Sequence, residues 1–221
     1  MLQVIILTAL CAVFATVFLR AEMHNKYVSA DVWKGFASLC FVLIGLLNSP
    51  GGNVATLLIY GLILGFIADI LLNLRFIFKK RGQLAFLIGI LVFLAGHIVY
   101  LIAILEMSTN WKICITIGLA LAGLLILWLF QIISAKLPFK IFGVIYIGAI
   151  MLMNAVAVGN LIAKPSAFTA IFALGAFLFL ISDIVLIINT FGKKFRESFR
   201  ISNIVLYYAG QILIGVSLMF L

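Results

Sequence analysis

Apolar residues fill this chain in long runs, and short polar segments separate one run from the next. A helix that crosses the hydrocarbon core of a bilayer needs about 20 mostly apolar residues, and about eight runs approach that length. They lie near residues 2–19, 32–48, 54–74, 84–105, 112–134, 140–160, 166–189 and 201–220. The pattern predicts an all-α, polytopic integral membrane protein with a single transmembrane domain over residues 1–221.

The polar connections between these runs are too short to hold a soluble domain. They are expected at residues 20–31, 48–53, 75–83, 106–111, 135–139, 161–165 and 190–200. Composition agrees with a membrane protein, because 67% of the residues are hydrophobic, 10% are charged and the mean hydropathy is +1.37. A soluble domain is only about 45–50% apolar and about 25% charged.

The charge balance changes this picture little. A net charge of +9 would suit nucleic acid. The basic residues, however, lie in short clusters between the apolar runs, as in membrane-protein loops, and no nucleic-acid partner is expected. The 3 cysteines lie inside apolar runs without a CxxC pair, which predicts buried thiols rather than a zinc or redox motif.

Basic residues are distributed unevenly among the connections. Only Lys112 and Lys164 of the 15 basic residues belong to even-numbered connections. The odd-numbered connections and their flanks hold Arg20, Lys26, Lys34, Arg75, Lys79, Lys80, Arg81, Lys136, Lys140, Lys193, Lys194, Arg196 and Arg200. By the positive-inside rule the odd-numbered connections face the cytoplasm, so both termini face away from it. A small chain of this kind favours a bacterial inner membrane.

The two halves of the chain resemble each other. Asp69 aligns with Asp183, Lys79-Lys80 with Lys193-Lys194, and Ala95-Gly96-His97-Ile98 with Ala209-Gly210-Gln211-Ile212. An internal duplication into halves 1–110 and 111–221 would make two parallel four-helix repeats, since four spans return the chain to the same side. Chance similarity combined with similar site chemistry is the alternative.

Few polar groups lie at depth in the predicted spans, where ionisable residues indicate function. Asp69 and Asp183 each lie six residues inside the cytoplasmic end of a span, a depth of roughly 9 Å at 1.5 Å per residue. Lys34 can lie at a comparable level. The other candidates are His97, Tyr100, Tyr146, Asn154, Ser182, Tyr207, Tyr208 and Gln211. Any single Asn, Gln or Tyr among them could instead only join helices, and Lys34 could extend to the interface.

Helical spacing places these polar groups on shared faces. Asp69 continues a stripe with Gly61 and Gly65, which predicts close packing against another helix. His97 shares a face with Tyr100, Gln211 with Tyr207 and Tyr208, and Tyr146 with Asn154. We therefore expect one polar pocket that opens toward the cytoplasm. Zinc commonly takes three protein ligands, and His97 is the only imidazole in a span, so no metal is expected.

Four segments together resemble the YhhN family, which includes eight-span lysoplasmalogenases. They are Gly-Phe-Ile-Ala-Asp69, Phe93-Leu-Ala-Gly-His97-Ile-Val-Tyr100, Phe179-Leu-Ile-Ser-Asp183 and Tyr207-Tyr208-Ala-Gly-Gln211, and Lys34 matches a family lysine. The resemblance implies hydrolysis of the vinyl ether bond of a lysoplasmalogen, giving a fatty aldehyde and a glycerophospho-ethanolamine or -choline. It implies a lysophospholipid substrate and no cofactor, with Asp69 and Asp183 as the catalytic pair and the remaining polar candidates binding substrate.

Two carboxyl groups suit this chemistry on independent grounds. A vinyl ether is cleaved by protonation of its outer alkene carbon, which leaves an oxocarbenium ion that water attacks. One carboxylic acid must supply the proton while a carboxylate stabilises the cation, as in two-carboxylate glycosidases. A proton-coupled carrier of small molecules or lipids, or a non-catalytic lipid-binding protein, would also place polar groups at depth. Consumption of lysoplasmalogen by purified protein separates the hydrolase from both alternatives.

Overall fold

The computed structural model describes residues 1–78, 80–135 and 137–221. Lys79 and Lys136, which contribute to the predicted orientation, lie outside the described residues. Within the described ranges the chain forms eight helices that are long and apolar enough to cross a membrane. They are α1 (Leu2–Met23), α2 (Tyr27–Leu47), α3 (Asn53–Ile77), α4 (Gly82–Leu105), α5 (Trp111–Ile132), α6 (Leu137–Ala163), α7 (Ala167–Phe191) and α8 (Glu197–Ser217), and a short 3₁₀ turn covers Leu218–Phe220.

This architecture confirms the all-α, polytopic fold. None of the described residues belongs to a strand, and one isolated bridge pairs Ile133 with Gly192. The predicted spans differ from the helices mainly at their ends. At the first connection, α1 continues to Met23 and α2 begins at Tyr27.

The helices extend beyond the ends of the apolar runs for a physical reason. Hydropathy marks where the hydrocarbon core ends, whereas helical hydrogen bonds continue into the interface beneath polar side chains that extend to water. The first connection is therefore shorter than the predicted residues 20–31 and consists of His24, Asn25 and Lys26. Asn25 makes the turn with a φ of 58°. The α2–α3 connection turns on Gly51 and Gly52, whose φ values of 82° and 90° favour glycine.

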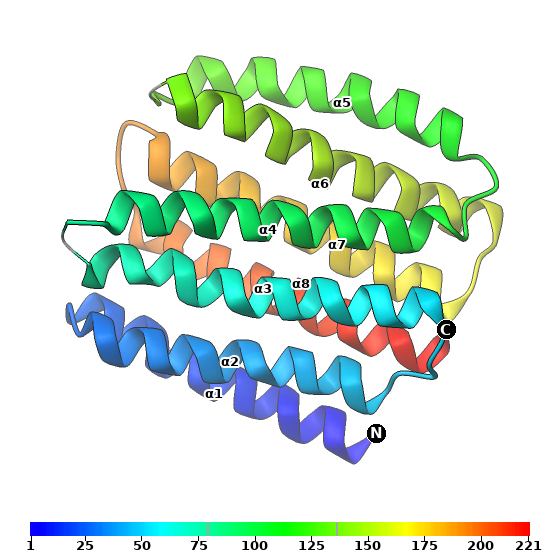
Figure 1. Cartoon of the computed structure of the whole chain (residues 1–221), viewed down its shortest axis with the longest axis horizontal. Coiled ribbons are helices and arrows are strands. Elements are labelled where there is room, and N and C mark those ends of the chain that lie inside the picture. Colours follow the sequence, from blue (N-terminus) through cyan, green and yellow to red (C-terminus); the bar gives the residue numbers. More distant parts are fainter. Residues whose placement is uncertain (79, 136) are drawn as a thin grey trace.

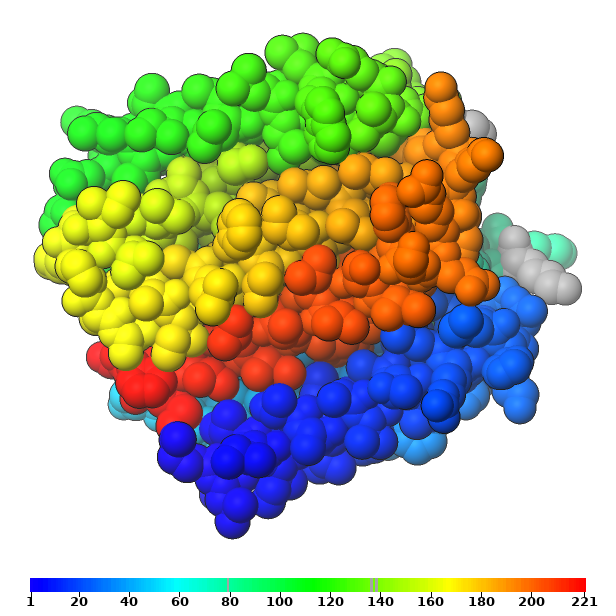
Figure 2. Space-filling model, turned by 180° about the vertical axis from the view of Figure 1, so that it is seen from behind, coloured from blue at the N-terminus to red at the C-terminus, as the bar shows by residue number. Residues whose placement is uncertain are grey.

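The helices form one bundle in which α3, α4, α7 and α8 lie between two helix pairs (Figure 1). The most extensive pairings join α3 to α4 and α7 to α8, followed by α1 with α2 and α5 with α6. Seen from behind, α7 and α8 run between the α5–α6 pair and α1 (Figure 2). Both termini lie at one end of the bundle, and the connections that follow α1, α3, α5 and α7 lie at the other (Figure 1).

The bundle is apolar outside and polar inside. Large apolar side chains of α5 are exposed, among them Ile113, Ile117 and Leu124. Lys34, Asp69, His97, Asp183 and Gln211 are all buried. Such a distribution is expected where lipid is the solvent and ionisable groups face the interior.

Glycines bring α3 into close contact with its neighbours. A Cβ atom at Gly61 would collide with the ring of Tyr100 in α4, and one at Gly65 would lie 2.7 Å from Nε2 of Gln211 in α8. The predicted close packing of the Gly61-Gly65-Asp69 stripe is thus confirmed. Asp69 consequently faces the interior of the bundle.

Candidate active site

Asp69 lies in α3 and is surrounded by donors from α2 and α8. The ammonium of Lys34 lies 3.0 Å from Oδ1 of Asp69 and also donates to the main-chain oxygen of Asp69 at 3.2 Å. The hydroxyls of Ser38 and Tyr207 each donate to Oδ2 at 2.6 Å. A buried ion pair is favourable only with such additional hydrogen bonds, and the ammonium and the two hydroxyls supply the charge and the donors that an Asp69 carboxylate needs.

A further layer of polar side chains supports the Asp69 carboxylate. The Tyr208 hydroxyl lies 3.3 Å from Oγ of Ser38 and donates to the main-chain oxygen of Lys34 at 3.3 Å. Gln211 accepts a hydrogen bond from Tyr100 at 2.8 Å and donates to the Tyr207 hydroxyl at 3.4 Å. These contacts fix the orientation of the hydroxyls that face Asp69.

Asp183 lies in α7, and its partners come from α4 and α6. The Tyr146 hydroxyl donates to Oδ2 of Asp183 at 2.6 Å. Nε2 of His97 lies 3.0 Å from the Tyr146 oxygen and 3.5 Å from Oδ2 of Asp183. Because Tyr146 uses its proton on Asp183, its oxygen accepts from His97. Among the described residues Asp183 has no Lys or Arg within ion-pair distance, which distinguishes it from Asp69.

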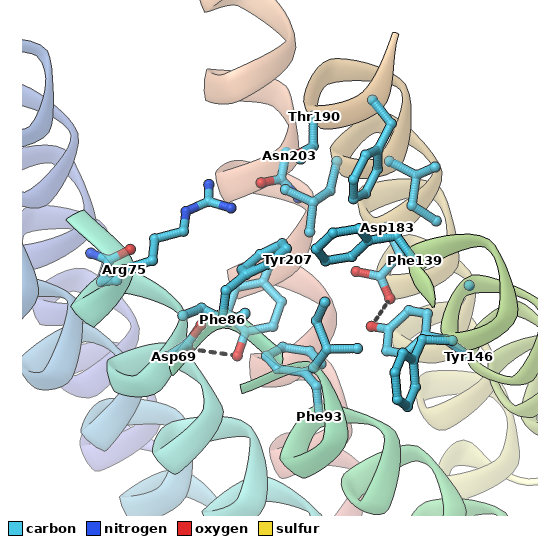
Figure 3. A pocket seen from close by; sticks show the side chains of 18 of the residues that line it. Asp69, Arg75, Phe86, Phe93, Phe139, Tyr146, Asp183, Thr190, Asn203 and Tyr207 are labelled. Carbon is cyan, nitrogen blue, oxygen red and sulfur yellow. Dashed lines mark hydrogen bonds between the residues drawn. The ribbon is translucent and has the colours of Figure 1, made fainter. Parts of the chain in front are cut away.

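Aromatic rings lie between the two carboxyl groups. Phe93 packs against Tyr207 with ring centroids 5.7 Å apart and against His97 at 6.0 Å. Phe179 lies 5.3 Å from Tyr207 and 4.6 Å from His97. Figure 3 shows Asp69 and Asp183 on opposite sides of the pocket, with Tyr207 and Phe93 between them. Each carboxyl group therefore has its own polar partners, and aromatic rings separate the two groups.

Both carboxyl groups line one cavity of about 950 Å³, its open mouth included. Most of the remaining lining is apolar and includes Leu72, Phe86, Ile90, Phe93, Phe139, Phe142, Leu186, Ile187, Phe191 and Ile204. A concave, mostly apolar site with a few convergent polar groups is the usual form of a small-molecule site. Its walls suit a hydrocarbon chain, and its two carboxyl groups suit proton chemistry.

The cavity extends toward the end of the bundle where α3 and α7 finish and α8 begins. Arg75, Thr190 and Arg200 line it there and also line a neighbouring hollow that contains Glu22. Arg200 donates to both carboxylate oxygens of Glu22 at 2.8 Å. The odd-numbered connections lie at this same end, and that this end faces the cytoplasm stays a prediction.

The structure brings together most of the candidate residues. Lys34, Asp69, Tyr146, Asp183 and Tyr207 line the cavity. His97, Tyr208 and Gln211 are buried behind them and contact lining residues, and Tyr100 in turn donates to Gln211. None of these four side chains forms the surface of the cavity. Their roles in substrate binding stay predictions.

Two candidates have other contacts. The Asn154 amide donates to the main-chain oxygen of Ile150 in its own helix at 2.9 Å. Ser182 donates to the main-chain oxygen of Asn203 at 3.0 Å, and the Asn203 amide donates back to Ser182. Neither Asn154 nor Ser182 lines the cavity; Ser182 joins α7 to α8 through Asn203, which does line it, and the substrate-binding roles of Asn154 and Ser182 stay predictions. A periodicity argument assigns a face to a residue but not the neighbour on that face.

Sequence reasoning missed other residues of the site. Ser38 donates directly to Asp69, although only its depth in a span singles it out in the sequence. Arg75 and Arg200 count in the sequence as cytoplasmic charges, yet both line the cavity. The available signal was axial position: Arg75 follows Asp69 by six residues, so it lies about 9 Å further along the same helix, toward the end at which the cavity opens.

A metal ion would need several ligating side chains around one point. Across the described ranges, no group of three or more His, Cys, Asp or Glu side chains is arranged to bind one. His97 and Asp183 form a pair, whereas Asp69 has its own partners around Lys34. The arrangement instead offers one carboxyl group paired with a lysine and one carboxyl group whose partners are a tyrosine and a histidine.

Comparison with known protein families gives a match over most of the chain. The sequence profile of the YhhN family matches residues 29–218, which include both carboxyl groups and all residues named in their networks. No curated protein and no solved structure gives a significant match.

Proposed function

The chain belongs to the YhhN family, which includes lysoplasmalogenases, and from this premise we propose that it hydrolyses the vinyl ether bond of lysoplasmalogens within the membrane. The observation that carries the proposal is a pair of buried carboxyl groups with different partners on opposite sides of one mostly apolar cavity. The products would be a fatty aldehyde and a glycerophospho-ethanolamine or -choline. The apolar walls would hold the alkenyl chain beside the carboxyl groups.

Asp183 is assigned the role of general acid. It has no Lys or Arg partner among the described residues, so a neutral, protonated carboxyl group is compatible with its surroundings. In the first step its proton forms a C–H bond with the outer alkene carbon, using the π electrons of the double bond. The inner carbon and the ether oxygen then share the positive charge of an oxocarbenium ion, and Asp183 becomes a carboxylate.

Asp69 is assigned the role of electrostatic stabiliser. Lys34, Ser38 and Tyr207 hold it as an anion in fixed orientation, and a preorganised charge stabilises a developing cation in a low-dielectric site. Water then attacks the inner carbon and gives its proton to Asp183, which regains its acid form. The resulting hemiacetal breaks its bond to the glycerol oxygen, which takes the hydroxyl proton, and the aldehyde is released.

A direct assay tests this function. Purified protein in detergent, without any ion gradient, should convert a lysoplasmalogen into aldehyde and glycerophospho-alcohol, measured by mass spectrometry. The same lipid with a saturated ether in place of the vinyl ether is the control and should remain intact, because it has no alkene carbon to protonate. A proton-coupled carrier or a lipid-binding scaffold would leave both lipids unchanged, and that result would contradict the proposal.

A further inference from the structure

The mouth of the cavity contains an arginine that has no hydrogen-bond acceptor for one of its buried donors. Arg75 lies in the last turn of α3, and the centre of its guanidinium is 4.4 Å from the ring centroid of Phe76 and 4.5 Å from that of Phe86. Its Nε is buried and has no hydrogen-bond partner among the residues that the structure describes. A buried donor without an acceptor is costly, so this group is suited to an acceptor brought by a ligand.

A second arginine lies at the same mouth and is already fixed in position. Nε and Nη2 of Arg200 donate to the two oxygens of Glu22 at 2.8 Å, and Nη1 donates to Asn203 at 3.3 Å. Arg75 and Arg200 line both the cavity and the neighbouring hollow. Glu22 and Glu197 line that hollow but not the cavity, whose lining at this end carries the two arginines as its charged side chains. The cavity side of the mouth therefore favours an anionic ligand.

Lys34, the other cation lining the cavity, is unsuited to this ligand. Its ammonium lies 3.0 Å from the Asp69 carboxylate and also donates to the main-chain oxygen of Asp69, and its side chain is only 5% exposed. A phosphate at Lys34 would have to displace or approach that carboxylate, with like charges in contact. A phosphate site at Lys34 is therefore less favourable than one at the mouth.

We propose that Arg75, assisted by Arg200, binds the phosphodiester group of a single-chain glycerophospholipid at the mouth of the cavity. This inference rests on the proposed function and assigns the part of its substrate that the carboxyl groups do not contact. A guanidinium matches the geometry of phosphate oxygens with a planar fork of donors, and stacking on Phe76 and Phe86 holds that plane in place.

The separation along α3 fits such a ligand. Arg75 follows Asp69 by six residues, an axial rise of about 9 Å. In a lysoplasmalogen a short glycerol backbone of similar length separates the phosphate from the vinyl ether. A phosphate at Arg75 would thus place the vinyl ether at the level of Asp69 and Asp183, with the alkenyl chain along the apolar lining. The head group would remain at the interface.

Binding of a non-cleavable ligand tests this site independently of hydrolysis. The probes are a lysophospholipid with a saturated ether chain, the same ether chain on glycerol without phosphate, and inorganic phosphate, each titrated against purified protein in detergent. Wild type should bind the phospholipid more tightly than the phosphate-free lipid. Arg75→Gln should weaken phospholipid binding about 10- to 100-fold, as expected for loss of a charge-assisted contact, and should leave the phosphate-free lipid unchanged.

Two further variants make the test decisive. Arg20→Gln removes the same charge from the same end of the bundle, but Arg20 is exposed and does not line the cavity, so binding should not change. Arg75→Lys keeps the charge without the planar pair of donors and should give an intermediate affinity.

Equal phospholipid affinity in wild type and folded Arg75→Gln would overturn the site. Inorganic phosphate binding as tightly as the phospholipid would overturn the head-group assignment. A protein that binds the phospholipid through Arg75 but leaves lysoplasmalogen intact would refute the hydrolase alone.

Discussion

Asp69 and Asp183 are chemically identical side chains whose partners make them different. Asp69 faces one ammonium and two hydroxyl donors, whereas Asp183 faces one hydroxyl and a histidine. An anion inside a membrane protein needs a compensating charge, and a neutral acid does not. The difference in partners therefore supports a division of labour, with charge stabilisation at Asp69 and proton transfer at Asp183.

Replacing either carboxyl group by an amide should remove most of the turnover. Asn keeps the size and much of the hydrogen bonding of Asp but cannot exchange the proton or carry the charge. General acid–base help is typically worth about 10²–10⁴-fold, so Asp69→Asn and Asp183→Asn should each lower kcat by at least that range. The double variant should lose less than the product of the two single effects, because the residues act on one transition state.

The measurement is steady-state turnover of lysoplasmalogen by each variant that remains monodisperse in detergent. Asn160→Ala is a suitable control, since the Asn160 amide donates to the main-chain oxygen of Ile104 and the residue does not line the cavity. Near wild-type kcat in either Asn variant would rule out the paired-carboxyl mechanism.

Lys34 offers a second prediction at the residue scale. Lys34→Met should leave the Asp69 carboxylate buried without its cation, and breaking a buried ion pair in this way typically costs about 3–5 kcal/mol. We expect a lower unfolding temperature and a lower kcat. The double variant Lys34→Met/Asp69→Asn should regain thermal stability but not activity, because it removes the unpaired charge together with the stabilising carboxylate.

Thermal unfolding in detergent and turnover together decide the role of Lys34. If Lys34 instead holds the lipid phosphate, Lys34→Met should mainly raise KM, with stability and kcat close to wild type. That outcome would contradict the pairing seen in the structure and would also weaken the assignment of the phosphate to Arg75.

Individual helices show which features of the structure can be predicted from the sequence and which cannot. Helical spacing correctly placed Asp69 on the glycine stripe of α3, because a period of 3.6 residues fixes which side chains share a face. Spacing does not reveal which helix lies opposite that face. For this reason the sequence singled out Ser182 but not its partner Asn203, and counted Arg75 among the loop charges rather than at the cavity mouth.

The contact between α3 and α4 gives a prediction at the element scale. Gly61→Ala would place a Cβ against the Tyr100 ring, which is fully enclosed and donates to Gln211. Overpacking of this kind typically costs about 1–3 kcal/mol, so the unfolding temperature should fall. Because Gln211 supports Tyr207, activity should fall as well.

Gly123→Ala in α5 is the matched control for Gly61→Ala. Nothing lies within 4 Å of a Cβ at Gly123, and alanine is the better helix former, so this variant should be as stable as wild type or slightly more stable. Unfolding temperatures that shift equally in the two variants would contradict the close approach of α3 and α4.

Across the whole molecule, each half of the chain completes the other's carboxyl site. Asp69 in α3 accepts from Tyr207 in α8, and Asp183 in α7 is contacted by His97 in α4. The fourth helix of each predicted half, 1–110 and 111–221, thus reaches the carboxyl group of the opposite half. This exchange agrees with the predicted duplication, which stays a prediction, and it explains why one half alone would lack a complete site.

The orientation of the whole bundle is the last prediction. Basic residues gather at the end where the odd-numbered connections lie, opposite both termini (Figure 1). The positive-inside rule places that end, with the cavity mouth, in the cytoplasm.

A single cysteine introduced at Ser49, in the α2–α3 connection, should react in intact cells with a reagent that does not cross the membrane. A cysteine at Gly192, after α7, should react only once the membrane is opened. The native thiols of Cys11, Cys40 and Cys114 are buried and should contribute little background. The reverse labelling pattern would place the mouth on the outer face, so that its phosphate-binding arginines would meet lipids of the opposite leaflet.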